Sequence, residues 1–189
     1  MTRHDRCCIR STSRRRRAFT LIEMLVVVSI LGIAGAMVIP QMGSVGVLRV
    51  QGAIRQIVSD ITFAQSDAIA FQQRRAIVFD VPNSRYTLVS IPGATVDPAV
   101  NTMFDPARPD GRYVVTIGGT ATGGARIASA TFNGTSTLIF DDMGSPAAAA
   151  SGDTPGLGGT IRVTSDDQVY DIVIEPYTGR ISVRKIEGN

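Results

Sequence analysis

The sequence RRRRAFTLIEMLVVVSILGIAGAMVIP, residues 14–40, joins a basic run to an apolar segment and decides how the chain is organised. No charged residue occurs in 24–48, and residues 21–39 are aliphatic almost throughout. About 20 residues of helix, rising about 1.5 Å each, cross the apolar core of a bilayer. Arginines beside such a segment are typical of its cytoplasmic end. Glu23 is the one charge inside the apolar stretch and needs an explanation.

The charge distribution separates the N-terminal tip from the rest of the chain. Of the 19 Lys and Arg and the 16 Asp and Glu residues, seven arginines and one acid lie in 1–18, so the net charge of +3 hides a value of −3 for residues 19–189. Both cysteines, Cys7 and Cys8, and the one histidine, His4, also lie in the tip. Residues 19–189 therefore cannot form disulfides, Cys/His zinc sites or histidine-activated nucleophiles. We expect no enzyme and no cofactor.

Three interpretations of the apolar segment can be compared. A buried helix of a soluble protein does not account for the basic flank. A cleaved secretory signal fits Ala34-Gly35-Ala36 as its cleavage site and would release a secreted soluble β-rich binding domain. Glu23 is costly at the start of such a signal. The apolar run also continues to Ile39, where a polar region should follow the cleavage site.

The third interpretation accounts for Glu23. Residues 18–25, AFTLIEML, closely resemble the class III signal of type IV pilins and type II secretion pseudopilins. The resemblance implies that a prepilin peptidase cuts between Ala18 and Phe19, that Phe19 is N-methylated, and that the apolar segment stays on the protein. Glu23 then becomes the fifth mature residue, the family's glutamate position, and Pro40 the twenty-second, where the family often has a helix-kinking proline. Ala18 departs from the glycine that the family usually has before the cut.

Physical chemistry supports a functional Glu23. A carboxylate in hydrocarbon costs about 2.5–3.5 kcal/mol on insertion scales, so such a residue needs a partner. The partner that the resemblance implies is the α-amino group of Phe19, on a neighbouring subunit or on the same chain. Opposite charges paired in a low-dielectric helix bundle offset part of each other's desolvation. Glu23 is therefore expected to act in filament assembly by setting the register of one helix against the next.

The pattern becomes amphipathic after Pro40. Apolar residues recur at i, i+3, i+4 and i+7, which predicts that the helix continues over 41–73 and packs on a soluble domain. We expect one helix over 19–73, kinked at Pro40, whose part 19–40 is the transmembrane and filament-core segment. The polar residues Asp60 and Gln65 fall off the predicted stripe. The stripe consists of Val47, Val50, Ile54, Ile57, Val58, Ile61, Ala64, Ala68 and Phe71.

Residues 74–189 change to a strand pattern and are expected to form a periplasmic β-rich globular domain. Short apolar runs rich in β-branched residues alternate with turn residues. The predicted fold class is α+β, with the long N-terminal helix packed on an antiparallel sheet, as in pilins. Segments 92–112 and 144–159 are expected to be exposed loops. The predicted strands are 75–81, 85–91, 112–118, 135–141, 159–165, 168–176 and 180–186.

This order of elements resembles the GspH/FimT-like branch of minor pseudopilins and minor pilins, in which a helix precedes two sheets. The resemblance rests on Phe140, Gly144 and Pro146 and on the hairpin residues 179–183, GRISV. It implies a minor pseudopilin, single-pass in the bacterial inner membrane with leader 1–18 in the cytoplasm, that nucleates or caps a periplasmic filament for protein export. Its partners would be minor and major pseudopilins or pilins, the prepilin peptidase and the inner-membrane assembly platform. The alternative is a FimT-like minor pilin for pilus assembly or DNA uptake.

Arg180, Arg184 and Lys185 are the candidate DNA-binding residues. Some FimT-like pilins bind DNA through a C-terminal Gly-Arg-x-Arg element, and here Ser182 stands where the second arginine would be. Arg184 follows Arg180 by four positions and so lies on the same face of a strand. Two or three cations bind phosphates weakly and with strong salt dependence. The pattern therefore favours a solvated strand face, and we expect no nucleic-acid partner.

Asp141 and Asp142, with Asp153 or with residues 166–167, are the candidate cation ligands. A calcium site needs six to eight oxygen ligands. These acids flank turns, where aspartate bends the chain by bonding nearby backbone groups. The sequence therefore favours turn formation over metal binding, and we expect no metal.

Overall fold

The computed structural model describes residues 19–38, 44–119, 122, 124–165 and 168–186, with the side chains of 36–38 and 44–47 left out. The chain divides into two units, Met1–Met42 and Gly43–Asn189, and each is treated by itself. The predicted leader 1–18 with Ala18, and the predicted kink at Pro40, lie outside the described residues.

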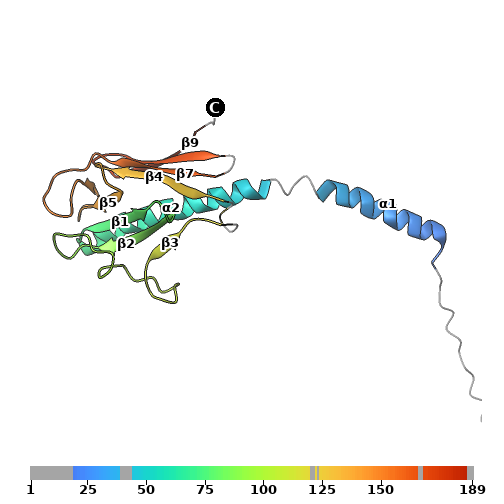
Figure 1. Cartoon of the computed structure of the whole chain (residues 1–189), viewed down its shortest axis with the longest axis horizontal. Helices are drawn as coiled ribbons and strands as arrows, with labels where there is room; N and C mark the ends of the chain where they lie inside the picture. Colours follow the sequence, from blue (N-terminus) through green and yellow to red (C-terminus); the bar gives the residue numbers. More distant parts are fainter. Residues whose placement is uncertain (1–18, 39–43, 120–121, 123, 166–167, 187–189) are drawn as a thin grey trace, which may run out of the picture. The chain divides into compact units, whose positions relative to one another are not determined.

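The first unit contains helix α1, Leu21–Val38 (Figure 1). The structure describes two helices where the sequence predicts one, because the second, α2, covers Ser44–Phe71 and residues 39–43 are not described. The described side chains of α1 are exposed on every side of the helix. Among the described helices, none meets the length and apolarity that a membrane crossing requires. The membrane segment 19–40 stays a prediction that extends beyond α1.

Helix α2 buries the face that its periodicity predicts. Val50, Ile54, Ile57, Ile61, Ala64 and Ala68 are each at most 5% exposed, and Val58 packs partly against the same core. Phe71 is an exception, because it ends the helix and is 69% exposed. Val47 has no described side chain. The stripe is confirmed from Val50 to Ala68, about five turns of α2, where the helix packs against the sheets.

The globular unit has two antiparallel sheets, in agreement with the predicted α+β fold and the two-sheet arrangement implied by the resemblance. The strand orders are β3-β2-β1-β5-β6 and β4-β7-β8-β9. All seven predicted strands are present. The first sheet contains β1 (Arg75–Asp80), β2 (Arg85–Ser90), β3 (Val114–Thr116), β5 (Thr137–Phe140) and β6 (Pro146–Ala147). The second contains β4 (Arg126–Phe132), β7 (Gly159–Thr164), β8 (Val169–Ile174) and β9 (Ile181–Ile186).

Two strands were not expected from the sequence. The register of β4 against β7 shifts between Ile127 and Ser129, so Ala128 and Ser129 are both exposed and the period-2 pattern is broken. β6 lies in the Ala-rich run that was expected to be an exposed loop. That expectation was wrong for Pro146 and Ala147, which are buried where β6 pairs with β5. The small side chains of this run fit the edge of the first sheet, although an alanine-rich composition suggests a loop.

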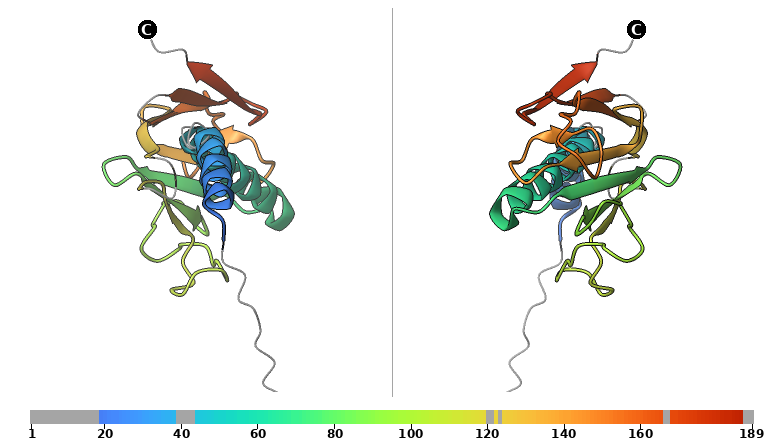
Figure 2. Two further views of the ribbon diagram at one scale, coloured as in Figure 1. Left: turned by 90° about the vertical axis from the view of Figure 1, so that its right-hand side faces the viewer. Right: turned by 90° about the vertical axis from the view of Figure 1, so that its left-hand side faces the viewer.

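One apolar core joins α2 to both sheets. It contains helix residues such as Ile57 and Ile61 together with Leu88 and Phe140 of the first sheet and Ile172 of the second. Figure 2 shows the sheets as separate layers next to α2. A smaller cluster lies on the other face of the first sheet. It contains Ala76, Val89, Ile91, Ile139 and Ala147, with Val96 and Ala150 packed against it from the flanking loops.

A single amide on α2 connects turns that belong to different sheets. Gln65 Nε2 donates to the carbonyl of Gly144, in the turn after β5, at 2.7 Å, and to that of Thr178, in the turn after β8, at 3.3 Å. Gly144 and Gly179 have φ values of 80° and 63°. A Cβ on Gly179 would lie 2.6 Å from Gln65 Nε2 and 3.3 Å from Phe140 Cε1. The glycines therefore allow both turns to approach the helix.

Replacement of Gly179 by alanine should destabilise the fold more than the same change at Gly152. Both residues have positive φ, 63° and 84°, but a Cβ at Gly152 has no neighbour within 4 Å. A left-handed alanine costs about 1–2 kcal/mol at either position. Gly179→Ala should lose about 1–2 kcal/mol more, because it displaces the Gln65 amide from its two carbonyls. Urea unfolding followed by tyrosine fluorescence measures the difference, and equal losses would contradict the role of Gln65.

Candidate assembly surfaces

The start of α1 brings together the residues that the N-terminal motif singled out. Glu23 donates its backbone N–H to Thr20 Oγ1 at 3.3 Å, and Met24 donates to the Thr20 carbonyl at 3.2 Å. Thr20 is thus the N-cap, and the sequence Thr-x-x-Glu has the form of a capping box. This signal was readable from the sequence and was missed. The cap means that α1 begins at a defined residue next to the predicted cleavage point.

The carboxylate of Glu23 is exposed at this end of α1. Among the described residues, no hydrogen bond or ion pair involves it. Phe19, 69% exposed, precedes the cap by one residue, so the two groups expected to pair lie at the same end of the helix. A carboxylate in the first turn is also favoured by the partial positive charge of the helix N-terminus. Ser29, a polar side chain further along α1, donates its hydroxyl to the Leu25 carbonyl at 2.8 Å.

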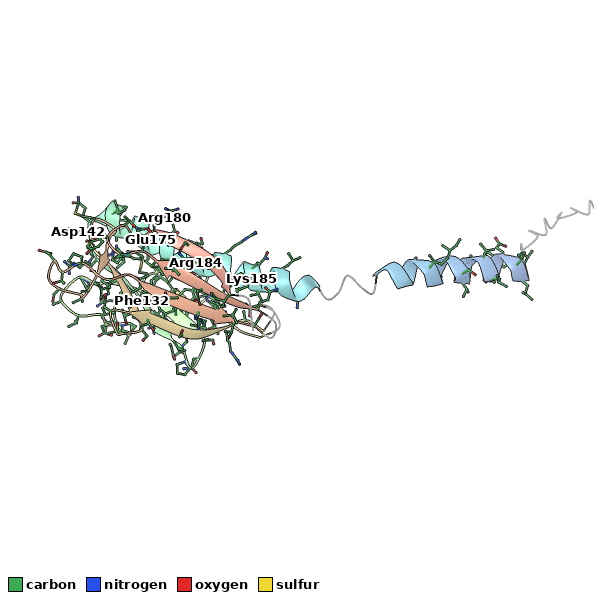
Figure 3. The ribbon with its side chains drawn as sticks, turned by 90° about the horizontal axis from the view of Figure 1, so that it is seen from above. Phe132, Asp142, Glu175, Arg180, Arg184 and Lys185 are labelled. Carbon is green, nitrogen blue, oxygen red and sulfur yellow. The ribbon has the colours of Figure 1, made fainter. Side chains whose placement is uncertain are left out.

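Of the predicted DNA-binding residues, Arg184 and Lys185 lie in β9 on opposite faces of its sheet, and Arg180 directly precedes the strand. Lys185 pairs across from Tyr170, which is buried, whereas Arg184 pairs across from Asp171 on the opposite face. Arg180 lies on the face of Arg184, about 13 Å away at about 3.3 Å per residue. Figure 3 shows the three side chains spread along the strand. They do not form one patch, and the expectation of no nucleic-acid partner stays a prediction.

The outer face of the second sheet carries mixed charge. Asp171 accepts from Arg162 Nε at 2.7 Å and from Nη2 at 2.8 Å, and this hydrogen-bonded guanidinium lowers the pKa of the Asp171 carboxyl. Arg184 lies on the other side of Asp171 in the cross-strand row. One carboxylate therefore separates two cations, which weakens this face as a phosphate-binding surface.

Asp141 takes the turn-forming role that the sequence favours. Its Oδ1 accepts the backbone N–H groups of Met143 at 3.0 Å and Ser145 at 2.7 Å, which fixes the turn between β5 and β6. In the described part of the chain, no group of three or more His, Cys, Asp or Glu residues could hold a metal ion. Residues 166–167, the other candidate cation ligands, lie outside that part.

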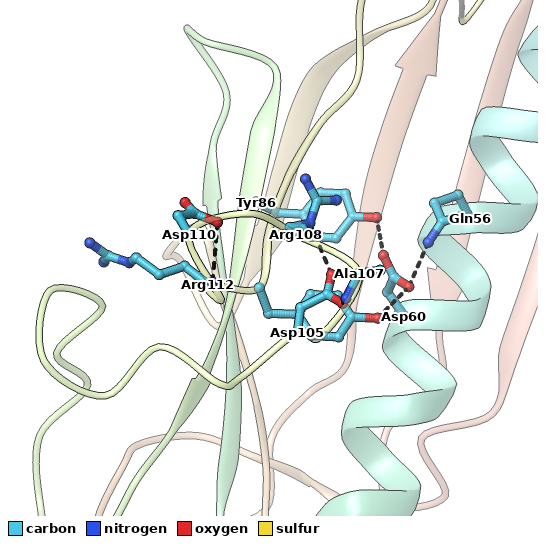
Figure 4. A network of polar contacts seen from close by, with 9 residues as sticks. Gln56, Asp60, Tyr86, Asp105, Ala107, Arg108, Asp110 and Arg112 are labelled. Carbon is cyan, nitrogen blue, oxygen red and sulfur yellow. Dashed lines mark hydrogen bonds and ion pairs between the residues drawn. The ribbon is translucent and has the colours of Figure 1, made fainter.

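Asp60 is the centre of a polar network that the sequence did not predict. Although it was expected on the polar face of α2, it is 2% exposed. Its carboxylate accepts from Tyr86 Oη at 2.5 Å, Tyr113 Oη at 3.0 Å and Gln56 Nε2 at 2.8 Å (Figure 4). The missed signal is spacing, since position 60 follows Ile57 by three residues and precedes Ala64 by four. The network attaches β2 and the residue before β3 to the helix.

Both tyrosines of this network hold their protons tightly. Burial, with the charge of Asp60 next in effect, raises the pKa of Tyr86 far above its ordinary value. The same causes raise the pKa of Tyr113 to about 12. Both phenols therefore act as donors over the physiological pH range. Asp105 adds to the rise at Tyr113, and it also forms an ion pair of 3.0 Å with Arg108.

Two family models match the chain, one at each of the regions described above. The prokaryotic N-terminal methylation motif matches residues 13–39, which contain the basic run, Phe19 and the capped start of α1. The model of the type II transport protein GspH matches residues 53–179, from α2 to the turn before β9. This is the arrangement of a pilin-like protein of the type II secretion system. The chain belongs to the GspH family.

The chain is similar to the minor pseudopilin EpsH from the type 2 secretion system of Vibrio cholerae, with 11% sequence identity and a TM-score of 0.46. The match covers 74% of this chain and 97% of that one. No curated protein matches the sequence.

Substitution of Asp60 by asparagine should lower the pKa of Tyr113 from about 12 toward 10.0, because it removes the nearby negative charge while burial remains. Asp105→Asn is the matched control and should lower that pKa less, since Asp105 contributes less to the rise. An alkaline titration followed by tyrosinate absorbance measures both. If the two variants shifted the pKa equally, Asp60 would not be the main charge that Tyr113 senses.

Proposed function

We propose that this chain is a minor subunit of a type II secretion pseudopilus, where it nucleates or caps the periplasmic filament that drives protein export. The observation that carries the proposal is the presence, in one chain, of the methylation motif at 13–39 and the GspH domain at 53–179. A filament subunit needs an apolar anchor and a separate body, and these two regions supply them. Its work is mechanical, with no catalysis.

The proposed route begins in the inner membrane, with residues 1–18 in the cytoplasm and residues 74–189 in the periplasm. The arginines of 14–17 support this orientation. A prepilin peptidase removes the leader after Ala18, and Phe19 is methylated. Residues 19–40 then move from the lipid into the filament core. The aliphatic side chains exposed on all sides of α1 support this step, because such a helix needs an apolar surrounding.

Glu23 supplies the register in this proposal. The cap keeps the backbone N–H of Glu23 satisfied by Thr20, so its carboxylate is available to an α-amino group. The partners are the other minor and major pseudopilins, the prepilin peptidase and the inner-membrane assembly platform. A role in DNA uptake would need a continuous basic surface, and Asp171 interrupts the row of Arg162 and Arg184.

The proposed processing predicts the mass of the mature chain. Protein extracted from the native membrane should begin at Phe19 and carry one methyl group. Intact-mass and N-terminal peptide analysis tests this directly. A chain that begins at Met37 would indicate an ordinary secretory signal, and the anchor and the filament role would both fall.

The proposed role of Glu23 predicts that loss of its charge and loss of the Thr20 cap have different effects on filament assembly. Glu23→Gln keeps the size of the side chain and the Thr20 cap but removes the charge, whereas Thr20→Val removes the cap, worth about 1 kcal/mol, and keeps the charge. We expect Glu23→Gln to reduce incorporation into the filament and protein export at least about tenfold, the effect of about 1.4 kcal/mol. Thr20→Val should have a smaller effect.

Both effects can be measured in cells that secrete their normal cargo, by subunit cross-linking in the membrane and by the amount of cargo in the medium. Equal loss in both variants would show that the start of the helix, and not the charge of Glu23, is what assembly requires. Full assembly with Glu23→Gln would exclude the charge pair.

A further inference from the structure

Two exposed apolar side chains line one hollow at the end of the globular unit where α2 finishes. The hollow has a volume of about 370 Å³, and its lining includes Met143, Tyr177, Pro155 and Arg74. Met143 is 81% exposed and Tyr177 is 66% exposed. Neither contributes to the core, so their large apolar surfaces are not explained by folding. Met and Tyr are among the residue types enriched at protein interfaces.

Hydrogen bonds fix the turns that carry these side chains. The turn of Met143 is closed by Asp141, and Gln65 binds the next carbonyl, that of Gly144. The turn of Tyr177 is closed by a bond of 3.1 Å from Gly179 N to the Glu175 carbonyl. Gln65 also contacts this second turn. Both side chains are therefore presented on pre-organised backbone, which lowers the entropy lost on binding.

The charges around the hollow identify what it would bind. Three carboxylates line it, those of Asp141, Asp142 and Asp153, against the one guanidinium of Arg74. Arg74 is already bound to the Gly152 carbonyl at 2.6 Å and to Asp153 at 3.2 Å. Among the described residues, no hydrogen bond or ion pair involves the Asp142 side chain, which is exposed. The remaining charge is negative and lies beside an aromatic face and a thioether.

We propose that this Met143–Tyr177 surface is a subunit interface that binds a Lys or Arg side chain presented by a different pseudopilin. The aliphatic stem of such a side chain would pack on Met143 and Pro155. Its cation would lie over the Tyr177 ring and close to Asp142. A second copy of this chain is a poorer occupant, because residues 19–189 carry a net charge of −3. The inference rests on the proposed pseudopilus function and specifies a contact within it.

The contact can be tested by photo-cross-linking in cells that express the full chain and export their normal cargo. A benzophenone amino acid placed at position 177 should cross-link to another pilin-like subunit, at a peptide containing Lys or Arg. The control position is Phe104, which is also aromatic and 73% exposed but does not line the hollow. Its cross-linking to that peptide should be at least about tenfold weaker, as expected for a site outside the contact.

Two variants test the energetics of the same contact. Tyr177→Gly removes the ring and relieves a φ of 63°, so a loss of export would not result from backbone strain at this position. Asp142→Lys reverses the unpaired charge. For these variants the benzophenone amino acid is placed at position 143. Each variant should reduce the cross-link from that position to the peptide containing Lys or Arg by about tenfold or more, as removal of an interface hot spot does. Each should also reduce export by about tenfold or more. Phe104→Ala should leave both within about twofold.

The outcomes separate this inference from the proposed function. If deletion of the whole chain leaves export intact, the proposed function fails. If deletion abolishes export, and chains that carry Tyr177→Gly or Asp142→Lys both restore full export to the deleted cells, only the interface is wrong. Cross-linking to a second copy of this chain, to a peptide without Lys or Arg, or equally from positions 177 and 104 would also overturn the interface.

Discussion

Burial of one face of α2 against two separate sheets is the constraint on which the globular unit depends. The 28 residues of this helix extend about 42 Å and provide an inner surface that both sheets share within the described core. Apolar burial alone does not fix where a sheet lies along such a face, because it has no direction. Asp60 and Gln65 at the borders of the stripe provide that direction. Asp60 is buried and requires donors such as Tyr86 and Tyr113, since an unsatisfied buried polar group is costly. The partly buried Gln65 binds the carbonyls of two turns.

The periodicity of the sequence determines which face of α2 is buried, but not how far the coverage extends around the helix. Ile57 and Ile61 could be predicted because they lie at the centre of the stripe. Asp60 and Gln65 could not, since a polar residue at its border is equally compatible with water or with a second sheet. The same limit explains β4, in which a bulge after Ile127 interrupts the alternation that makes a strand recognisable.

The residues proposed for assembly also differ in whether the sequence alone could identify them. Phe19 and Glu23 could be identified from a contiguous motif, because their relation is one of sequence spacing. Arg184 and Lys185 are neighbours in sequence and were grouped for that reason, yet pairing with β8 places them on opposite faces of the sheet. The Met143–Tyr177 surface was inaccessible to sequence reasoning altogether. It depends on the approach of the turns after β5 and β8, which Gln65 connects, and nothing in either turn indicates the other.

The cap at Thr20 and the charge of Glu23 depend on each other in the proposed filament. In an apolar surrounding no water is present to satisfy the first N–H groups of α1, so a side-chain acceptor there matters more than in water. Without Thr20, the carboxylate of Glu23 would divide its interactions between those N–H groups and an amino group of another subunit, which is a smaller loss than removal of its charge. With Thr20 bound to the Glu23 N–H, the carboxylate can leave its own helix without exposing that donor. In the proposed filament the Thr-x-x-Glu spacing would therefore serve both the start of the helix and the pairing of helices.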